Sequence, residues 1–237
     1  MSSHDQQQST KSRSDSARNN ILEKLKQQVI GADYSKLPTE VNYQYPVLTQ
    51  QEQTDQFIAH LEANHAQVIK LNKNEIPIIV SQLLKIRGIS SLLMGKDPAH
   101  METVCGLENK MDKSITINTF DFALHNNQEN KDRLFNHSPA SITHSHCAIA
   151  ATGSIVLWPT INEPRSLSLI PPLHFVIVDA ESIHQDFSSL IKVQRWQDKL
   201  PSNIVLVSGP SKTADIQQTL AYGAHGPKEL IVLLLNA

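Results

Sequence analysis

The sequence lacks the features that define several large protein classes. Its two cysteines, Cys105 and Cys147, form no spacing motif, which argues against a disulfide framework or a cysteine-rich metal module. Aromatic residues make up 5% of the chain and the formal net charge is -2, so neither a base-stacking nor a basic nucleic-acid surface is indicated. The chain shows no secretory h-region and no apolar run of bilayer-spanning length. We therefore expect a cytoplasmic protein that neither binds nucleic acid nor spans a membrane.

The first 48 residues differ in composition from the rest of the chain. Residues 1–20 are polar and charged without apolar periodicity, which predicts a disordered tail. Residues 21–48 begin with a helical repeat of apolar residues that ends at Gly31, and continue as a proline-containing linker. Because this helix has no core of its own, we expect it to pack on the main domain or on a partner. Residues 49–237 are predicted to form one domain.

From residue 49 onward, apolar segments alternate between strand and helix patterns. Strand-like runs lie at 66–71, 89–94, 154–158, 174–178 and 230–235. Segments with helical periodicity lie between several of these runs, and alternation of this kind is typical of βαβ units. The pattern predicts a three-layer α/β fold, in which a mostly parallel sheet has helices on both faces.

Residues 203–226 are interpreted as a strand, a tight turn and a helix. Ile204–Val207 is a short β-branched run typical of a buried strand. A helical pattern follows from Thr213, with Ile216 on its apolar face and Gly223 at its end. A strand that leads into a helix N-terminus directs several free backbone N–H groups to one place, which suits an anion.

The turn itself holds four candidate ligand-binding residues, Gly209, Ser211, Lys212 and Thr213. Ser211 or Thr213 would cap the helix, and Lys212 would add positive charge. The alternative is a well-capped helix with Lys212 in solvent. A serine-hydrolase elbow is disfavoured because Thr213 stands where that motif needs glycine, and the glycine frame of a phosphate-binding P-loop is missing.

Three other positions carry groups that suit a carboxylate. The turn Thr152–Gly153–Ser154 offers hydroxyl and backbone N–H groups, although an ordinary β-turn has the same composition. Arg165 closes a proline-flanked loop and would clamp a carboxylate, although a lone loop arginine is more often solvated. His225 lies in the turn before the last strand, where a histidine bonded to the backbone is an equal alternative.

His144, His146 and Cys147 invite comparison with a metal site. On a strand, the two histidines share a face while Cys147 points to the other side, so only two ligands converge. No third ligand is indicated elsewhere in the chain, and we predict no metal site.

Several segments resemble one known family. A glycine turn between two strands lies at 148–157, and an Arg-to-Pro-Pro-x-His segment runs from Arg165 to His174. A paired signature follows, Gly-Pro-Ser-Lys-Thr-Ala-Asp-Ile from Gly209 and Gly-Ala-His-Gly-Pro from Gly223. Together these segments resemble the LUD-domain family, and within it the lactate-utilisation protein C branch.

The resemblance implies an α/β domain similar to the sugar-phosphate isomerase and CoA-transferase-like folds. It also implies a role in oxidising L-lactate to pyruvate with iron–sulfur partner proteins, which would hold the clusters, so that no cofactor is expected in this chain. One departure concerns catalysis. Ala151 stands where many relatives carry an acidic residue before Thr-Gly, so this chain lacks that carboxylate as a general acid or base.

These observations lead to one hypothesis and two alternatives. We expect the turns at Thr152–Gly153–Ser154 and Ser211–Lys212–Thr213 to meet with His225 around a small carboxylate, with Lys212 or Arg165 as the cation. No catalytic residue is assigned. The alternatives are a stand-alone enzyme of the CoA-transferase or cycloligase kind, and a non-catalytic assembly or regulatory subunit that binds its partners through the N-terminal helix and linker.

Overall fold

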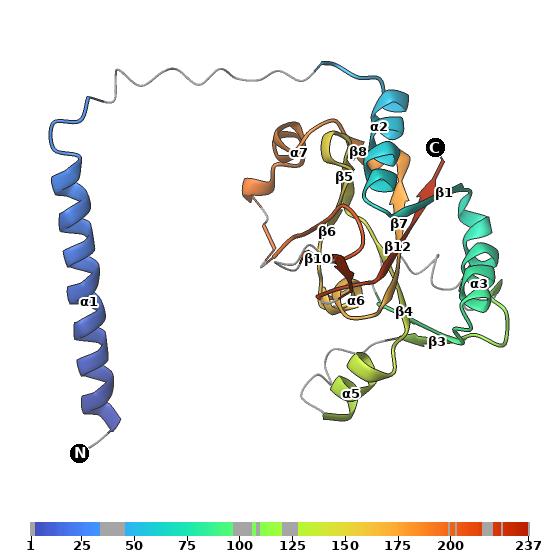
Figure 1. The fold of residues 1–237 in the computed structure, drawn as a ribbon, viewed down its shortest axis with the longest axis horizontal. Coiled ribbons are helices and arrows are strands. Elements are labelled where there is room, and N and C mark those ends of the chain that lie inside the picture. Colours follow the sequence, from blue (N-terminus) through green and yellow to red (C-terminus); the bar gives the residue numbers. More distant parts are fainter. Residues whose placement is uncertain are drawn as a thin grey trace. The chain divides into compact units, whose positions relative to one another are not determined.

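The computed structural model describes residues 3–33, 46–96, 106–107, 110–119, 128–198, 200–201, 203–214, 220–223 and 225–236. The chain divides into two compact units, Met1–Gln44 and Tyr45–Ala237. Figure 1 labels the helices and strands of both units. No helix among the described residues combines the length and the apolar character that crossing a bilayer requires.

The N-terminal unit contains one long helix, α1 (Ser3–Gln28), which is followed by a turn with Gly31 at a φ of 80°. This helix includes most of residues 1–20, for which the composition predicts a polar tail. No proline or glycine interrupts Ser3–Gln28, and its Gln, Lys, Arg and Ala residues tolerate a helix well. Within this unit, Ile21 and Leu25 are exposed. Packing of this helix on the main domain or on a partner stays a prediction.

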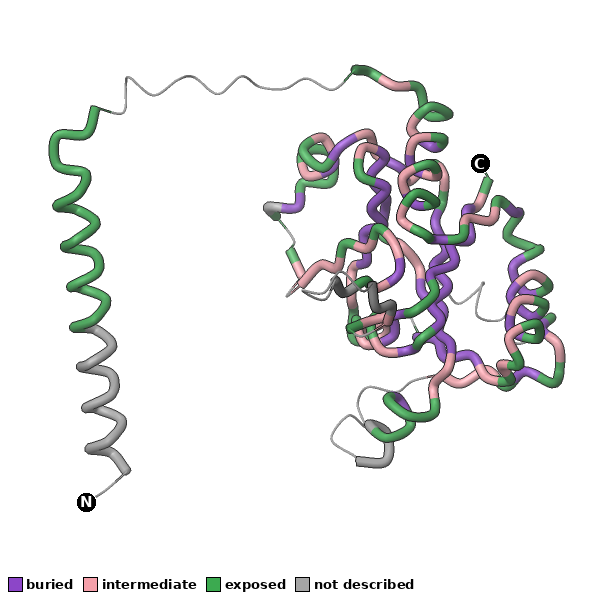
Figure 2. Tube along the Cα trace, viewed as in Figure 1, coloured by how far each residue is buried: buried purple, intermediate pink, exposed green. Residues whose placement is uncertain are grey.

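The larger unit is built on a six-stranded sheet in which every strand pair is parallel. Its strands, in spatial order, are β1 (Gln67–Leu71), β12 (Glu229–Leu235), β7 (Leu173–Asp179), β4 (Ala140–His144), β2 (Ser91–Met94) and β3 (Thr116–Thr119). The central strands are buried along almost their whole length (Figure 2). Continuous apolar runs of this kind are what a parallel sheet covered on both faces requires.

One face of this sheet is covered by α3 (Ile76–Ile86), which follows the short 3-10 turn η2 (Lys73–Glu75). Pro77 lies in the first turn of α3, where its missing N–H costs little. The apolar cluster on this face includes Val80 and Leu84 of α3 with Phe175 and Leu233 of the sheet.

The other face is covered by α2 (Gln50–Ala63) and by a second sheet. That sheet has four strands in the order β8 (Ile183–His184), β5 (Cys147–Ile149), β6 (Ser154–Leu157) and β9 (Val205–Val207). Phe57 and Leu61 of α2 share a cluster with Val176 and Val178 of β7 and with Ile155 of β6. The three-layer α/β prediction is confirmed, with the addition of this second sheet.

The remaining elements are short. They are α5 (Gln128–Asn136), η5 (Ala150–Thr152), α6 (Ser166–Leu169), η6 (Ala180–Ser182), α7 (Phe187–Gln194), η7 (Trp196–Asp198), β10 (Lys212–Ala214) and β11 (Leu220–Tyr222). In contrast to the predicted buried strand, β9 is an edge strand of the second sheet, and its Leu206 is 50% exposed.

Candidate functional site

The segment that follows β9 is a strand and not the predicted helix. β10 pairs antiparallel with β11, and Lys212 lies opposite Tyr222. The helix was predicted from only a few apolar positions. A short strand can have the same apolar positions as a short helix, so the pattern does not distinguish the two. The predicted helix N-terminus at this turn is therefore wrong, and the argument that its free N–H groups attract an anion falls with it.

The two parts of the paired signature meet at Ser211. The Ser211 N–H donates to the Pro227 carbonyl at 2.8 Å, and the Gly223 N–H donates to the Ser211 carbonyl at 3.0 Å. Gly226 packs closely on this residue, because an added Cβ would lie 3.1 Å from the Ser211 Cβ. These contacts hold Ser211 and the loop of His225 side by side.

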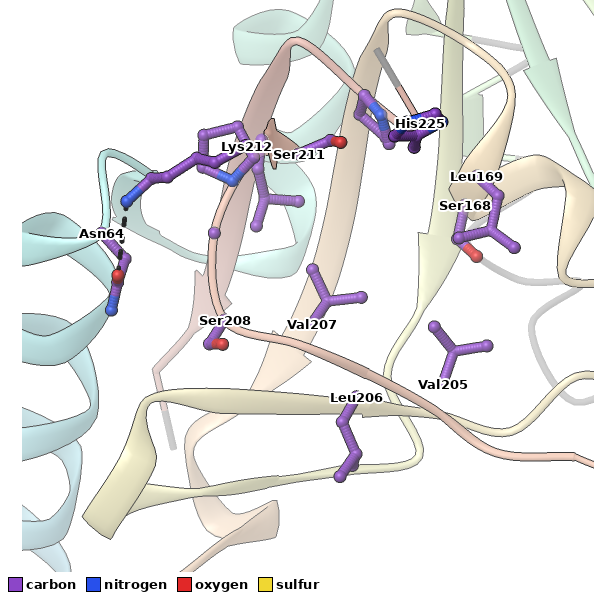
Figure 3. A pocket seen from close by; sticks show the side chains of 15 residues that line it. Asn64, Ser168, Leu169, Val205, Leu206, Val207, Ser208, Ser211, Lys212 and His225 are labelled. Atoms are coloured by element: carbon purple, nitrogen blue, oxygen red, sulfur yellow. Dashed lines mark hydrogen bonds between the residues drawn. The ribbon is translucent and has the colours of Figure 1, made fainter. Parts of the chain in front are cut away.

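A cavity of about 350 Å³ opens between this loop pair and β9 (Figure 3). Its lining residues are Asn64, Ser168, Leu169, Val205, Leu206, Val207, Ser208, Gly209, Pro210, Ser211, Lys212, His225, Gly226, Pro227 and Leu230. The structure thus brings together four of the nine predicted ligand-binding residues, namely Gly209, Ser211, Lys212 and His225. The side chain of a fifth, Thr213, lies outside the described residues.

Lys212 supplies positive charge to this cavity. Its ammonium lies 3.4 Å from the Asn64 Oδ1 (Figure 3), and the Asn64 Nδ2 donates to the His60 carbonyl at 3.0 Å, which directs Oδ1 toward the lysine. Among the described residues, no carboxylate forms an ion pair with Lys212. Lys212 lines the cavity and is itself exposed.

Gly209 allows the close approach of β9 and α2. A Cβ at this position would lie 2.6 Å from the Asn64 carbonyl oxygen, which is backbone and has little freedom to move. Glycine is thus required here for packing, and the contact fixes Asn64 at the edge of the cavity.

The turn at Thr152–Gly153–Ser154 lies outside this cavity. Gly153 has a φ of 60°, and an added Cβ would lie 2.5 Å from the His60 Cβ. The Thr152 and Ser154 hydroxyl groups hydrogen-bond each other at 2.8 Å. The turn thus packs against α2 and is not among the residues that line this cavity.

Arg165 also lies elsewhere. It lines a neighbouring crevice of about 10 Å³ with Thr143, Glu163 and Ser168, and Ser168 also lines the larger cavity. A space of this size holds about one water molecule, which is too little for a carboxylate ligand. Arg165 is therefore not the cation of the 350 Å³ cavity.

His174 is a candidate that the sequence interpretation left unassigned. Its side chain is fully buried, and its Nε2 lies 2.9 Å from the Thr143 Oγ1. Its Nδ1 has no hydrogen-bond partner among the described residues. Burial lowers the pKa of His174 to about 3, so the imidazole is neutral at physiological pH. The Pro-Pro-x-His segment was the feature of the sequence that could have pointed to His174. In the pairing of β7 with β12, His174 lies opposite Leu230, which lines the cavity.

The histidines near Cys147 do not share one strand. β4 ends at His144, and β5 begins at Cys147 in the second sheet. The His144 N–H donates to Glu163 Oε1 at 2.9 Å, and the His146 ring lies 4.6 Å from the Trp158 ring. Burial raises the pKa of the Cys147 thiol to about 12. Within the described ranges, no group of three or more potential metal ligands comes together.

A second large cavity, of about 520 Å³, lies at the carboxyl ends of β7 and β12. Asp179, Glu181 and Asn236 line it with Ala180, Ser182 and Leu235. None of these residues is a cation, and the two carboxylates would repel an anionic ligand. The 350 Å³ cavity is therefore the better site for a carboxylate.

Comparison with known proteins gives a consistent result. The LUD domain family model matches residues 54–235. Lactate utilization protein C of Oceanobacillus iheyensis is 26% identical over 207 residues, which are 83% of this chain and 86% of that protein. Lactate utilization protein C 1 of Bacillus mycoides is 28% identical over 193 residues, 80% of this chain and 81% of that protein.

Two further proteins are similar to this chain. An uncharacterised protein of Neisseria meningitidis is 42% identical over 106 residues, and this match spans 44% of the present chain and 46% of that protein. The crystal structure of a DUF162 family protein from Deinococcus radiodurans superposes with a TM-score of 0.56. That match covers 80% of this chain and 99% of the other at 19% identity, and it supports the fold alone.

Proposed function

Since the chain belongs to the LUD domain family, we propose that it is a component of an L-lactate utilisation system. In this proposal the system is cytoplasmic and oxidises lactate to pyruvate together with iron–sulfur partner proteins. The two relatives from Oceanobacillus iheyensis and Bacillus mycoides support the role, because they align with 83% and 80% of this chain.

The observation that carries the proposal is the Lys212 ammonium at the cavity, without an acidic partner among the described residues. A lysine in this position binds a carboxylate as a point charge. The Ser211 hydroxyl points toward His225, whereas the Lys212 ammonium points the other way, toward Asn64 (Figure 3). Lys212 would therefore hold the carboxylate, and Ser211 and His225 would bind a polar group on the other side of the cavity.

The division of labour follows from the chemistry of the reaction. Oxidation of lactate to pyruvate removes two electrons and two protons from the substrate. In the proposal, the iron–sulfur partners provide the electron acceptor. This chain binds the carboxylate, and His225 accepts a hydrogen bond or a proton.

Growth on lactate tests the proposal. A strain of the source organism that lacks the gene should grow on glucose but not on L-lactate, and the wild-type gene should restore growth. The Lys212→Gln variant should restore it poorly, whereas Lys113→Gln, which changes an exposed lysine away from the cavity, should restore it fully. Normal growth of the deletion strain on L-lactate would contradict the role.

One observation favours a second candidate function, that of an assembly subunit. Within the N-terminal unit, Ile21 and Leu25 of α1 are exposed on one helical face, and Val29 in the turn that follows is exposed too. If this face holds partner proteins, deletion of residues 1–44 should abolish their co-purification and leave lactate binding by the remaining domain unchanged. Equal recovery of partners with and without residues 1–44 would exclude this role for α1.

A further inference from the structure

The cavity beside Lys212 is too large for lactate alone. Its volume is about 350 Å³. Lactate has six non-hydrogen atoms, and even at the roughly 30 Å³ that one water occupies in the liquid they would fill about half of this space. A cavity of this size belongs to the range that binds larger organic molecules.

The cavity also has two chemically different sides. Val205 and Val207 project from the same side of β9 toward the loop that bears Ser211 and Lys212, with His225 beyond (Figure 3). Alternation along a strand places these two valines on one face. Both pack against the apolar cluster that includes Leu230, itself 2% exposed. An apolar floor thus faces a polar, positively charged rim.

We propose that the cavity binds an amphipathic monocarboxylate larger than lactate, with a straight or lightly branched apolar side group of about three to six carbons. The carboxylate lies at Lys212, and the side group lies on Val205 and Val207. The inference rests on the proposed function, because it takes this cavity as the carboxylate site, and it specifies the substrate class of that site. Longer 2-hydroxy acids are then better ligands than lactate.

Calorimetric titration of the full chain with a series of straight-chain 2-hydroxy acids tests this assignment. The series consists of lactate, 2-hydroxybutanoate, 2-hydroxyhexanoate and 2-hydroxyoctanoate. Each added methylene should lower the dissociation constant about threefold to fourfold until the apolar floor is covered. A dissociation constant that changes by less than twofold from lactate to 2-hydroxyoctanoate would overturn the inference. A failure of all four acids to bind would overturn it too.

Variants assign the effect to the cavity. Val207→Thr keeps the shape and the strand propensity of the side chain, and should weaken 2-hydroxyhexanoate binding about threefold or more while leaving lactate binding unchanged. Val193→Thr makes the same change at a helical position that is 68% exposed, and should leave both dissociation constants unchanged. If Val207→Thr does not fold, as judged by circular dichroism, Val205→Thr replaces it. Equal affinities in the cavity variant and its control would overturn the inference.

The outcomes separate this inference from the proposed function. If growth on lactate requires the gene but the dissociation constant does not depend on chain length, the proposed function stands and the inference is wrong. If the strain grows on lactate without the gene but the dissociation constant falls steeply with chain length, the amphipathic site stands and the lactate role is wrong.

Discussion

The two large cavities of this protein differ in charge and in their relation to the main sheet. The cavity of about 520 Å³ lies at the carboxyl ends of β7 and β12, where open parallel sheets usually bind ligands, but Asp179 and Glu181 line it. The cavity of about 350 Å³ lies beside the edge strand β9 and the amino end of β12, and Lys212 lines it. Ligands usually bind at the carboxyl ends of parallel strands, but here the residues at that edge are acidic. For an anionic ligand, the cavity lined by Lys212 is therefore the better site.

Reversing the charge of the smaller cavity should have the largest effect. Lys212→Glu would give this cavity the same sign of charge as the carboxyl-edge cavity. Replacing attraction by repulsion should weaken 2-hydroxyhexanoate binding by about a hundredfold or more, since charged hydrogen bonds contribute about 1.5–3 kcal/mol. Calorimetry measures the change, and retained affinity would show that the acid binds elsewhere.

The close packing behind the smaller cavity gives the next prediction. In Gly209→Ala, the new Cβ would collide with the Asn64 carbonyl oxygen, so β9 and the end of α2 must separate. We expect the free energy of unfolding to fall by about 1–3 kcal/mol, measured by urea denaturation. Gly106→Ala is the control, because a Cβ at Gly106 meets nothing within 4 Å and its φ lies outside the left-handed region. Equal stability of the two variants would contradict the packing account.

His174 makes the wall beside the smaller cavity sensitive to acid. Its pKa is lowered from 6.5 to about 3 by burial, so between these values the unfolded chain binds more protons than the folded one. Stability should therefore fall as pH drops below about 6.5, by up to about 1.4 kcal/mol per pH unit from this group. Denaturation of the wild type and His174→Gln at pH 7, 6 and 5 should show a shallower decline in the variant. Burial also lowers the pKa of His146 and His184, but they contribute to both proteins. Parallel declines would contradict the assignment.

A substitution in the cavity of about 520 Å³ should have the smallest effect on ligand binding. Glu181→Gln removes one of its carboxylates, and the dissociation constant for 2-hydroxyhexanoate should change by less than twofold. A clear gain or loss of affinity would move the binding site to the carboxyl edge of the sheet and reverse the comparison of the two cavities.

The main sheet was predictable because its strands are strongly patterned. The apolar runs within Leu173–Asp179 and Glu229–Leu235 are typical of strands buried on both faces. Helical periodicity marked α2 before the first strand and α3 between β1 and β2. Local pattern was sufficient there, since burial on both faces leaves few polar positions.

The candidate site was only partly predictable, because its geometry depends on contacts that are distant in sequence. Ser211, Lys212 and His225 were identified from turn chemistry, and a backbone hydrogen bond from Ser211 to Pro227 brings their loops together. The Gly153 turn looked equally suitable, but α2 packs on it through His60, a contact that no local pattern reveals. The predicted helix after Ser211 failed because three-residue strands carry too little periodicity to identify.

A crystal structure of the full chain with bound 2-hydroxyhexanoate tests the central claim most directly. The account predicts the carboxylate within about 3 Å of the Lys212 Nζ, with the alkyl group on Val205 and Val207. A carboxylate bound elsewhere, with the smaller cavity empty of ligand, would contradict it.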